Sequence, residues 1–237
     1  MRIFYILIII LTFETIIAQE TKYKVIPRDQ SNIDKSLVSF ITSLKEVCLK
    51  KDTSMLFEML DTGIVTSYGA GLFGKKDFKE KWKLQNPENS DLWDRFMFVI
   101  NLGGVFDTIN EKKFFIFPYA LSFDWDLDSE LDSTQKLSSP FNVFICIDKN
   151  IPVYEKPDTN SKVLNFLSYD IIVKDFDISQ KQNEKDNYQI NWNYILTLDK
   201  KIKGWILGES IYSSTGLEIQ LEKQKGKWKI TCFCSYD

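Results

Sequence analysis

Residues 217–234 read LEIQLEKQKGKWKITCFC and form the clearest single element of the chain. Apolar and polar residues alternate from Leu217 to Glu222, and they alternate again after the Lys225-Gly226 turn. A period of two predicts a hairpin of two antiparallel strands, each with one buried and one solvated face. Because an isolated hairpin is at best marginally stable in water, its apolar face requires a partner. The residues of the second strand expected on one buried face are Trp228, Ile230, Cys232 and Cys234.

The first part of the chain offers two strands with which the hairpin can pair. Ile64–Ser67 and Phe114–Phe117 are short apolar runs that predict strands in a region otherwise rich in helical periodicity. Helices are expected at residues 31–51, 52–61, 75–84 and 90–102, and Ser31 or Asn32 can cap the first of them. We hypothesise that the hairpin completes a sheet with these two strands, which makes the segment between them and the hairpin an insertion.

Residues 140–214 change in character to short β runs between polar turns. Three pieces of this segment are IPVYEKP at 151–157, SKVLNFLSYD at 161–170 and KGWILGESIY at 203–212. In this order they resemble a bacterial SH3-like domain, although Tyr154 stands where the family has arginine and Tyr169-Asp170 where glycine is usual. The whole layout also resembles uncharacterised exported bacterial SH3-domain proteins. This resemblance implies a small β-barrel and brings no activity with it.

Together these patterns predict an α+β protein. A helix-rich part with a few strands spans residues 19–139 and ends in an acidic linker, an SH3-like barrel spans 140–214, and the terminal hairpin spans 215–237. The acidic alternation that starts at Asp124 lacks the glycine and the glutamate of a calcium-binding EF-hand loop, so a solvated linker is expected there. Within the barrel, residues 177–187 are expected to form a charged loop.

Residues 1–18 have the layout of a secretory signal peptide. A basic start is followed by an apolar run from Ile3 to Phe13 and by Ala18 at the expected cleavage site. A retained anchor is the alternative, but the apolar run is about half the length of roughly 20 residues that a spanning helix needs. The chain is therefore expected to be periplasmic or secreted, with no stable membrane span after cleavage.

Composition excludes several classes of function. The absence of histidine excludes Ser-His-Asp and Cys-His catalysis in their usual forms and removes the commonest metal ligand. Lysine and arginine number 30 against 33 aspartates and glutamates, so there is no basic excess to bind a nucleic-acid backbone. Because no catalytic motif is recognisable, the chain is expected not to be an enzyme, and no cofactor is expected.

The four cysteines leave two alternatives open. In an exported chain, an even number of cysteines permits disulfides. Either all four are buried free thiols, or one bridge joins Cys48 or Cys146 to the terminal pair, Cys232 and Cys234. The terminal two are not expected to bond each other. Cys-x-Cys with two isolated partners and no histidine also lacks the ligand spacing of a zinc site, so no metal is expected.

The candidate binding residues are aromatic side chains of the predicted barrel. SH3-type folds hold extended peptides in aromatic grooves, and the resemblance implies a cell-wall peptide as the ligand. The groove residues expected from this resemblance are Tyr154, Trp192, Tyr194 and Tyr212. The alternative is that such rings fill the core of a small barrel, and Trp205, which follows a glycine in a strand, is expected to be structural.

The sequence thus favours an exported, non-enzymatic binding protein whose barrel recognises a peptide or a peptidoglycan fragment. Two other classes stay open, namely a cell-wall hydrolase that the barrel targets to its substrate and a structural envelope protein with a protein partner. For a hydrolase, the carboxylates near aromatics in the first part are Asp107, Glu111, Asp124 and Asp126. Paired carboxylates can hydrolyse glycosides, but the spacing of these four does not show that they converge.

Overall fold

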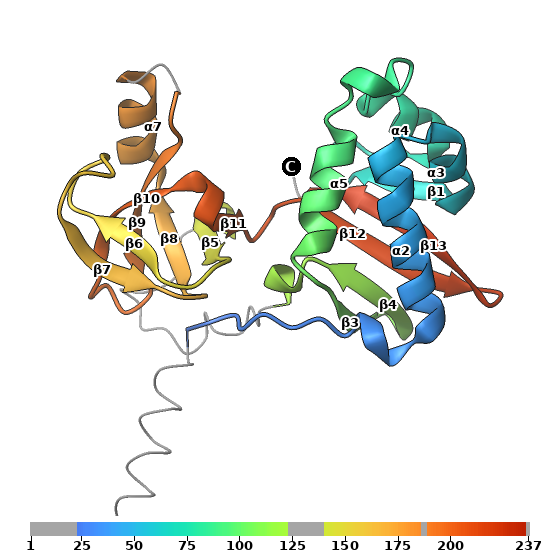
Figure 1. Ribbon diagram of the computed structural model, residues 1–237, viewed down its shortest axis with the longest axis horizontal. Coiled ribbons are helices and arrows are strands. Elements are labelled where there is room, and N and C mark those ends of the chain that lie inside the picture. Colours follow the sequence, from blue (N-terminus) through green and yellow to red (C-terminus); the bar gives the residue numbers. More distant parts are fainter. Residues whose placement is uncertain (1–22, 123–139, 186–188, 236–237) are drawn as a thin grey trace, which may run out of the picture. The chain divides into compact units, whose positions relative to one another are not determined.

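The computed structural model describes residues 23–122, 140–185 and 189–235, which belong to two compact units (Figure 1). The α+β unit contains residues 27–122 and 214–235, and the seven-stranded unit contains residues 23–26, 140–185 and 189–213. Helices and two sheets confirm the predicted mixed α+β class. The predicted signal peptide and the acidic segment from Asp124 lie outside the described residues.

Six strands form the sheet of the α+β unit, in the order β2-β1-β13-β12-β4-β3. The strands are β1 (Leu60–Ser67), β2 (Leu72–Phe73), β3 (Val105–Ile109), β4 (Lys112–Phe117), β12 (Glu218–Gln224) and β13 (Lys227–Cys234). The helices are α2 (Lys35–Lys50), α3 (Thr53–Met59), α4 (Gly74–Lys81) and α5 (Leu92–Asn101). Helix α3 ends before the expected residue, because Leu60 already pairs with Ile230 of β13 as part of the sheet.

The terminal hairpin lies in the middle of this sheet. Strand β12 pairs antiparallel with β4, where Leu221 lies opposite Phe115, and β13 pairs parallel with β1, where Ile230 lies opposite Leu60. These registers confirm the predicted pairing of the hairpin with strands of the first part. Strands β4 and β12 are therefore neighbours in one sheet although the whole seven-stranded sheet lies between them in the sequence.

An irregularity in β13 reverses the faces of its last residues. Leu221 pairs with Ile230, but the adjacent Gln220 pairs with Cys232, so β13 contains one extra residue at this point. Neighbouring residues of a strand face opposite sides, and Cys232 and Cys234 therefore face away from Ile230. The expectation of one shared buried face is wrong for the two cysteines, because a period-two pattern in the sequence does not reveal an inserted residue.

Phe233 joins the helices to the sheet. Its buried ring lies 4.1 Å from the ring of Phe96 in α5 and 4.8 Å from the ring of Trp82, which directly follows α4, measured between ring centroids. Phe78 of α4 lies 6.5 Å away in the same way. Helices α4 and α5 thus pack on the face of the sheet to which Phe233 points (Figure 1). Burial of these large rings supplies the hydrophobic contact that the hairpin requires.

The seven-stranded unit has the strand order β11-β5-β8-β9-β10-β6-β7. The strands are β5 (Val143–Cys146), β6 (Ile151–Tyr154), β7 (Val163–Leu167), β8 (Ile171–Asp175), β9 (Trp192–Thr197), β10 (Lys203–Leu207) and β11 (Ile211–Ser213). Its apolar core includes the fully buried side chains of Val153, Ile172, Ile195 and Ile206. Among the described strands, no pairing joins β11 to β7, so the structure establishes an antiparallel sheet and the SH3-like barrel stays a prediction.

Helix α7 (Phe176–Lys185) stands where a charged loop was expected. Strand β8 ends at Asp175. Beyond this point, side chains of α7 form the hydrogen bonds to the backbone of β9. Asn183 exchanges two hydrogen bonds with the backbone of Trp192, and the Ser179 hydroxyl accepts one from the backbone N–H of Tyr194 at 2.9 Å. The expectation was wrong because these tertiary hydrogen bonds, which the polar composition of the segment does not reveal, support a helix here.

The start of the described chain also belongs to the seven-stranded unit. The backbone N–H of Ile171 donates to the carbonyl of Tyr23 at 2.8 Å, and the N–H of Val25 donates to the carbonyl of Tyr169 at 2.9 Å. Lys24 adds an ion pair with Asp170 at 3.6 Å. Residues 23–25 therefore pair with residues 169–171 at the start of β8. In the sequence they precede all elements of the α+β unit.

Candidate functional site

The predicted aromatic residues come together only in part. Trp205 of β10 lies opposite Tyr154 of β6 on one side and opposite Tyr194 of β9 on the other. The Tyr194 and Trp205 rings pack edge to face with centroids 5.3 Å apart, and Tyr154 and Trp192 do so at 5.6 Å. Tyr212 lies in β11, which β5 and β8 separate from β9, so the sheet order does not bring it beside the other rings.

Burial favours a structural role for half of this aromatic cluster. Trp192 is 2% exposed and Tyr154 is 9% exposed, which leaves little ring surface for a ligand. Tyr194 and Trp205 are half-buried and present part of their rings. Packing against the sheet thus accounts for Trp192 and Tyr154, while Trp205, expected from the sequence to be structural, is half-buried like Tyr194.

All four cysteines are buried and free in the structure. Cys48 lies in α2 and Cys146 lies in β5, and neither forms the bridge to the terminal pair that the sequence left open. Burial raises the pKa of the Cys48 thiol to about 12 and also raises the pKa of the Cys146 thiol, so both are poor nucleophiles. The Sγ atoms of Cys232 and Cys234 lie 2.6 Å apart.

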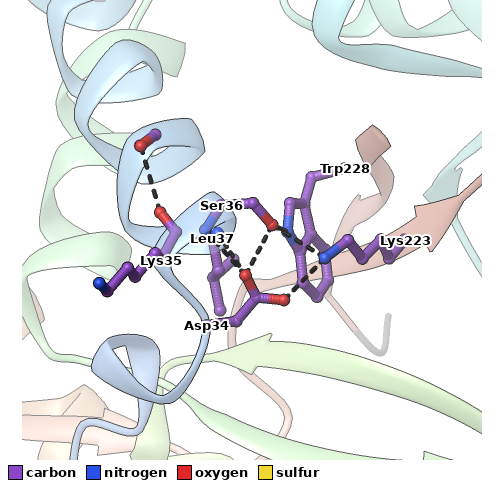
Figure 2. A network of polar contacts seen from close by, with 7 residues as sticks. Asp34, Lys35, Ser36, Leu37, Lys223 and Trp228 are labelled. Atoms are coloured by element: carbon purple, nitrogen blue, oxygen red, sulfur yellow. Dashed lines mark hydrogen bonds and ion pairs between the residues drawn. The ribbon is translucent and has the colours of Figure 1, made fainter. Parts of the chain in front are cut away.

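A polar network that the sequence did not predict lies where α2 begins beside the terminal hairpin (Figure 2). The Asp34 carboxylate accepts hydrogen bonds from the backbone N–H groups of Ser36 at 2.8 Å and of Leu37 at 3.4 Å, so it caps α2. Residues 31–33 form a separate turn of 3₁₀-helix, and the expectation that Ser31 or Asn32 caps the helix is therefore wrong. The helix begins later than its polar N-terminal residues suggested.

The same network joins α2 to the hairpin. The Asp34 carboxylate pairs with the ammonium group of Lys223 in β12 at 2.8 Å. The Ser36 hydroxyl donates to Asp34 at 2.6 Å, and it accepts from Lys223 at 2.9 Å and from the indole N–H of Trp228 at 3.0 Å. Figure 2 shows these side chains pointing toward one another from three elements. Trp228 is thereby held in one orientation.

A hollow of about 560 Å³ opens beside this network. Its lining residues are Ile33, Asp34, Lys35, Phe106, Lys112, Lys113, Glu222, Lys223 and Trp228. Four lysines face two carboxylates, a surplus of two positive charges in a chain whose net charge is −3. The Lys113 ammonium group lies 4.3 Å from the centroid of the Phe106 ring, so cationic and aromatic surfaces adjoin each other. A second hollow, of about 670 Å³, also reaches Trp228.

The sequence carried one signal for this hollow. Lys112 and Lys113 stand side by side ahead of the aromatic run of β4. Nothing in the local pattern places them near the start of α2, because that proximity depends on β12 lying beside β4. The hollow was therefore missed, while the aromatic residues of the other unit, which the resemblance named, were found only partly assembled.

The Asp34 carboxyl gives the network a pH dependence. The hydrogen bond from Lys223, followed by that from Ser36, holds the pKa of Asp34 well below its usual range. Because the folded-state pKa is lowered, its contribution to stability is present above the usual aspartate pKa of about 4 and is lost as the pH falls through the lower folded value. We expect Asp34→Asn, which keeps a capping side chain, to be less stable than the wild type at neutral pH.

We expect this stability difference to shrink below pH of about 4. Urea denaturation at neutral pH and at about pH 3 measures it. Asp91→Asn is the matched control, because it removes a carboxylate from an exposed ion pair with Arg95, at 2.7 Å, and such pairs contribute little. A difference for Asp34→Asn that stays constant across this pH range would contradict the expected role of its charge.

A scan against protein-family models, a search of the curated proteins and a search of the solved structures each gave no match to the chain. Among the helices of the described residues, none is long and apolar enough to cross a membrane.

Proposed function

We propose that this chain is an exported, non-enzymatic binding protein whose ligand is a peptide or a peptidoglycan fragment with free carboxylates. The observation that carries the proposal is the lysine-lined hollow beside Trp228. Its volume of about 560 Å³ lies in the range of pockets that hold small ligands, roughly 300–1,000 Å³. The peptide stems of peptidoglycan fragments carry carboxylates, which lysine ammonium groups bind.

The ion pairs of the four lysines support an anionic ligand, because only one of the four is paired with a carboxylate of the described residues. Lys223 is already paired with Asp34. Within the described part of the chain, no carboxylate lies at ion-pair distance from Lys35, Lys112 or Lys113. These three ammonium groups can therefore meet the charges of a ligand, while Phe106 and the exposed Ile33 offer apolar surface to its aliphatic parts.

The seven-stranded unit is proposed to be SH3-like and to take an extended peptide of the same wall. Strand β7 ends the sheet, and its side chains of Val163, Leu164 and Phe166 are exposed. An edge strand with unpaired backbone groups can add an extended peptide as a further strand. The half-buried rings of Tyr194 and Trp205 supply a second aromatic surface. Export itself is proposed from the leader in residues 1–18.

We expect the double variant Lys112→Gln/Lys113→Gln to bind a soluble disaccharide-tetrapeptide from digested peptidoglycan about tenfold more weakly than the wild type at low salt. Both side chains are exposed, so the change removes charge without disturbing the core. Isothermal titration calorimetry measures the affinity. The matched control is Lys76→Gln/Lys79→Gln, which removes two exposed lysines of α4 in the same unit.

Further measurements test this site and separate the other classes of function. Equal binding of the fragment after amidation of its carboxyl groups, or equal loss in the control variant, would overturn the proposed site. Release of soluble sugar or peptide from purified peptidoglycan would favour the hydrolase. Of the carboxylates considered for a hydrolase, Asp107 is exposed in β3 and Glu111 is exposed after it. Asp124 and Asp126 lie outside the described residues. Capture of an envelope protein without any binding to peptidoglycan would favour the structural class.

A further inference from the structure

Three side chains with metal-binding atoms converge on one face of the six-stranded sheet, and Phe233 points to the other face. One ligand atom each from Glu218, Cys232 and Cys234 lie within 4.8 Å of one another. The three residues are 4%, 1% and 0% exposed, respectively. The Sγ atom of Cys232 lies 3.7 Å from the Glu218 carboxylate and 2.6 Å from the Sγ atom of Cys234. This cluster lies outside the hollow beside Trp228.

The register of the hairpin brings the three side chains together. Glu218 is the direct partner of Cys234, and Gln220 is the direct partner of Cys232, on the two antiparallel strands. Partners of this kind have Cβ atoms about 5 Å apart and share one face of the sheet. The extra residue in β13 turns both thiols onto the face of the Glu218 carboxyl. Without it, the thiols would point toward the helices and the carboxyl would have no thiol partner.

Hydrogen-bond donors orient the Glu218 carboxylate, and within the described residues no cation forms an ion pair with it. Burial raises the pKa of the Glu218 carboxyl, against hydrogen bonds from Tyr68 and Gln220 that lower it. The Tyr68 hydroxyl lies 3.3 Å and the Gln220 amide 2.9 Å from the same carboxylate oxygen. None of these partners is a cation, and a buried acid without one is costly. Hydrogen bonds of this type hold metal-ligating carboxylates in place.

We propose that Glu218, Cys232 and Cys234 bind one Zn²⁺ ion. Zinc accepts thiolate sulfur at about 2.3 Å and carboxylate oxygen at about 2.0–2.2 Å, and four-coordinate tetrahedral sites are its usual geometry. Binding releases the two thiol protons to solvent, together with the carboxyl proton where Glu218 carries one. Rotation of the two cysteine side chains sets the sulfurs roughly 3.8 Å apart, as tetrahedral Zn–S bonds of about 2.3 Å require. Water completes the fourth position, and the Tyr68 hydroxyl keeps its hydrogen bond to the Glu218 carboxylate.

The test titrates the chain without residues 1–18, reduced and freed of metal by a chelator, with Co²⁺ and then with Zn²⁺. We expect one equivalent of Co²⁺ to produce a thiolate-to-cobalt charge-transfer band and the visible bands of tetrahedral cobalt, and Zn²⁺ to abolish both. Cys232→Ser and Cys234→Ser are each expected to weaken zinc binding by about 100-fold or more, and Glu218→Gln by roughly 10- to 100-fold. Competition with a chromophoric chelator measures these affinities.

Cys48→Ser is the matched control, because it removes another buried thiol of the same unit from outside the cluster and should leave zinc affinity unchanged. A readout on the wild type guards against variants that do not fold: zinc should slow the alkylation of Cys232 and Cys234, followed by mass spectrometry. Retained zinc affinity in Cys232→Ser/Cys234→Ser, a cobalt spectrum without a thiolate band, or unaltered alkylation with zinc would each overturn the proposal. A Cys232–Cys234 disulfide that persists under reductant and prevents metal binding would do so as well.

Discussion

Removal of residues 215–237 is expected to unfold the α+β unit while the seven-stranded unit stays folded. The deletion takes both central strands, β12 and β13, out of the six-stranded sheet and leaves the separate pairs β2-β1 and β4-β3. Two-stranded pairs are at best marginally stable in water, and the helices lose the apolar surface on which they pack. The expected loss of structure is therefore complete for this unit.

Calorimetry and amide NMR spectra of the truncated chain measure this effect. We expect the full chain to show the unfolding of both units and the truncated chain to show only that of the seven-stranded unit, whose core around Val153, Ile195 and Ile206 is untouched. A chain that stops after Ser235 is the control, because it keeps the whole of β13. Dispersed amide signals from α2 and α5 in the truncated chain would show that the hairpin is not essential to the unit.

Phe233→Ala is the point substitution with the largest expected effect on the stability of the α+β unit. The side chain is 0% exposed. It is surrounded by the rings of Phe96 in α5, Phe78 in α4 and Trp82, which directly follows α4. Truncation leaves a cavity between sheet and helices that rigid aromatic neighbours fill poorly. Such Phe→Ala changes cost about 3–5 kcal/mol, a large share of the roughly 5–15 kcal/mol that stabilises a domain.

Urea denaturation of the variant and the wild type, followed by tryptophan fluorescence, measures this loss. Phe73→Ala is the matched control, since Phe73 is 54% exposed in the same unit and its loss should cost about 0.5 kcal/mol or less. Equal destabilisation by the two substitutions would mean that Phe233 does not join the helices to the sheet. A midpoint that shifts for Phe233→Ala with an unchanged denaturant slope would confirm that stability alone has changed.

Periodicity in the sequence predicted the parts of the fold that depend on apolar pattern. The alternation from Leu217 onward required a partner sheet, and the short apolar runs that became β1 and β4 were the strands with which it pairs. The same logic located the four helices of the α+β unit, because α2, α3 and α5 each bury several apolar residues on one face and α4 buries Phe78. The pattern could not predict where α3 ends. Leu60 belongs to the sheet because it pairs with Ile230, which lies far away in the sequence.

The missed features depend on tertiary contacts between residues that lie apart in the sequence. The extra residue in β13 changes which face Cys232 occupies, and only the pairing with Gln220 reveals it. Helix α7 depends on hydrogen bonds from Asn183 and Ser179 to a strand that comes later in the chain. Glu218 looked like a solvated member of an alternating strand, yet it is buried beside two thiols. Residue type and spacing alone carry no record of such neighbours.

The order in which the chain visits its two units has a mechanical consequence. In the described part of the chain, residues 23–25 pair beside β8 of the seven-stranded unit, and β1 to β4 of the α+β unit follow. The seven strands β5 to β11 come next, and β12 and β13 then enter the six-stranded sheet. A protease that cuts the backbone once between β4 and β5 therefore yields two fragments. The first contributes residues 23–25 to the seven-stranded unit of the second, and the second contributes β12 and β13 to the six-stranded sheet of the first. The nicked molecule is held together by this mutual exchange, without any covalent link between its halves.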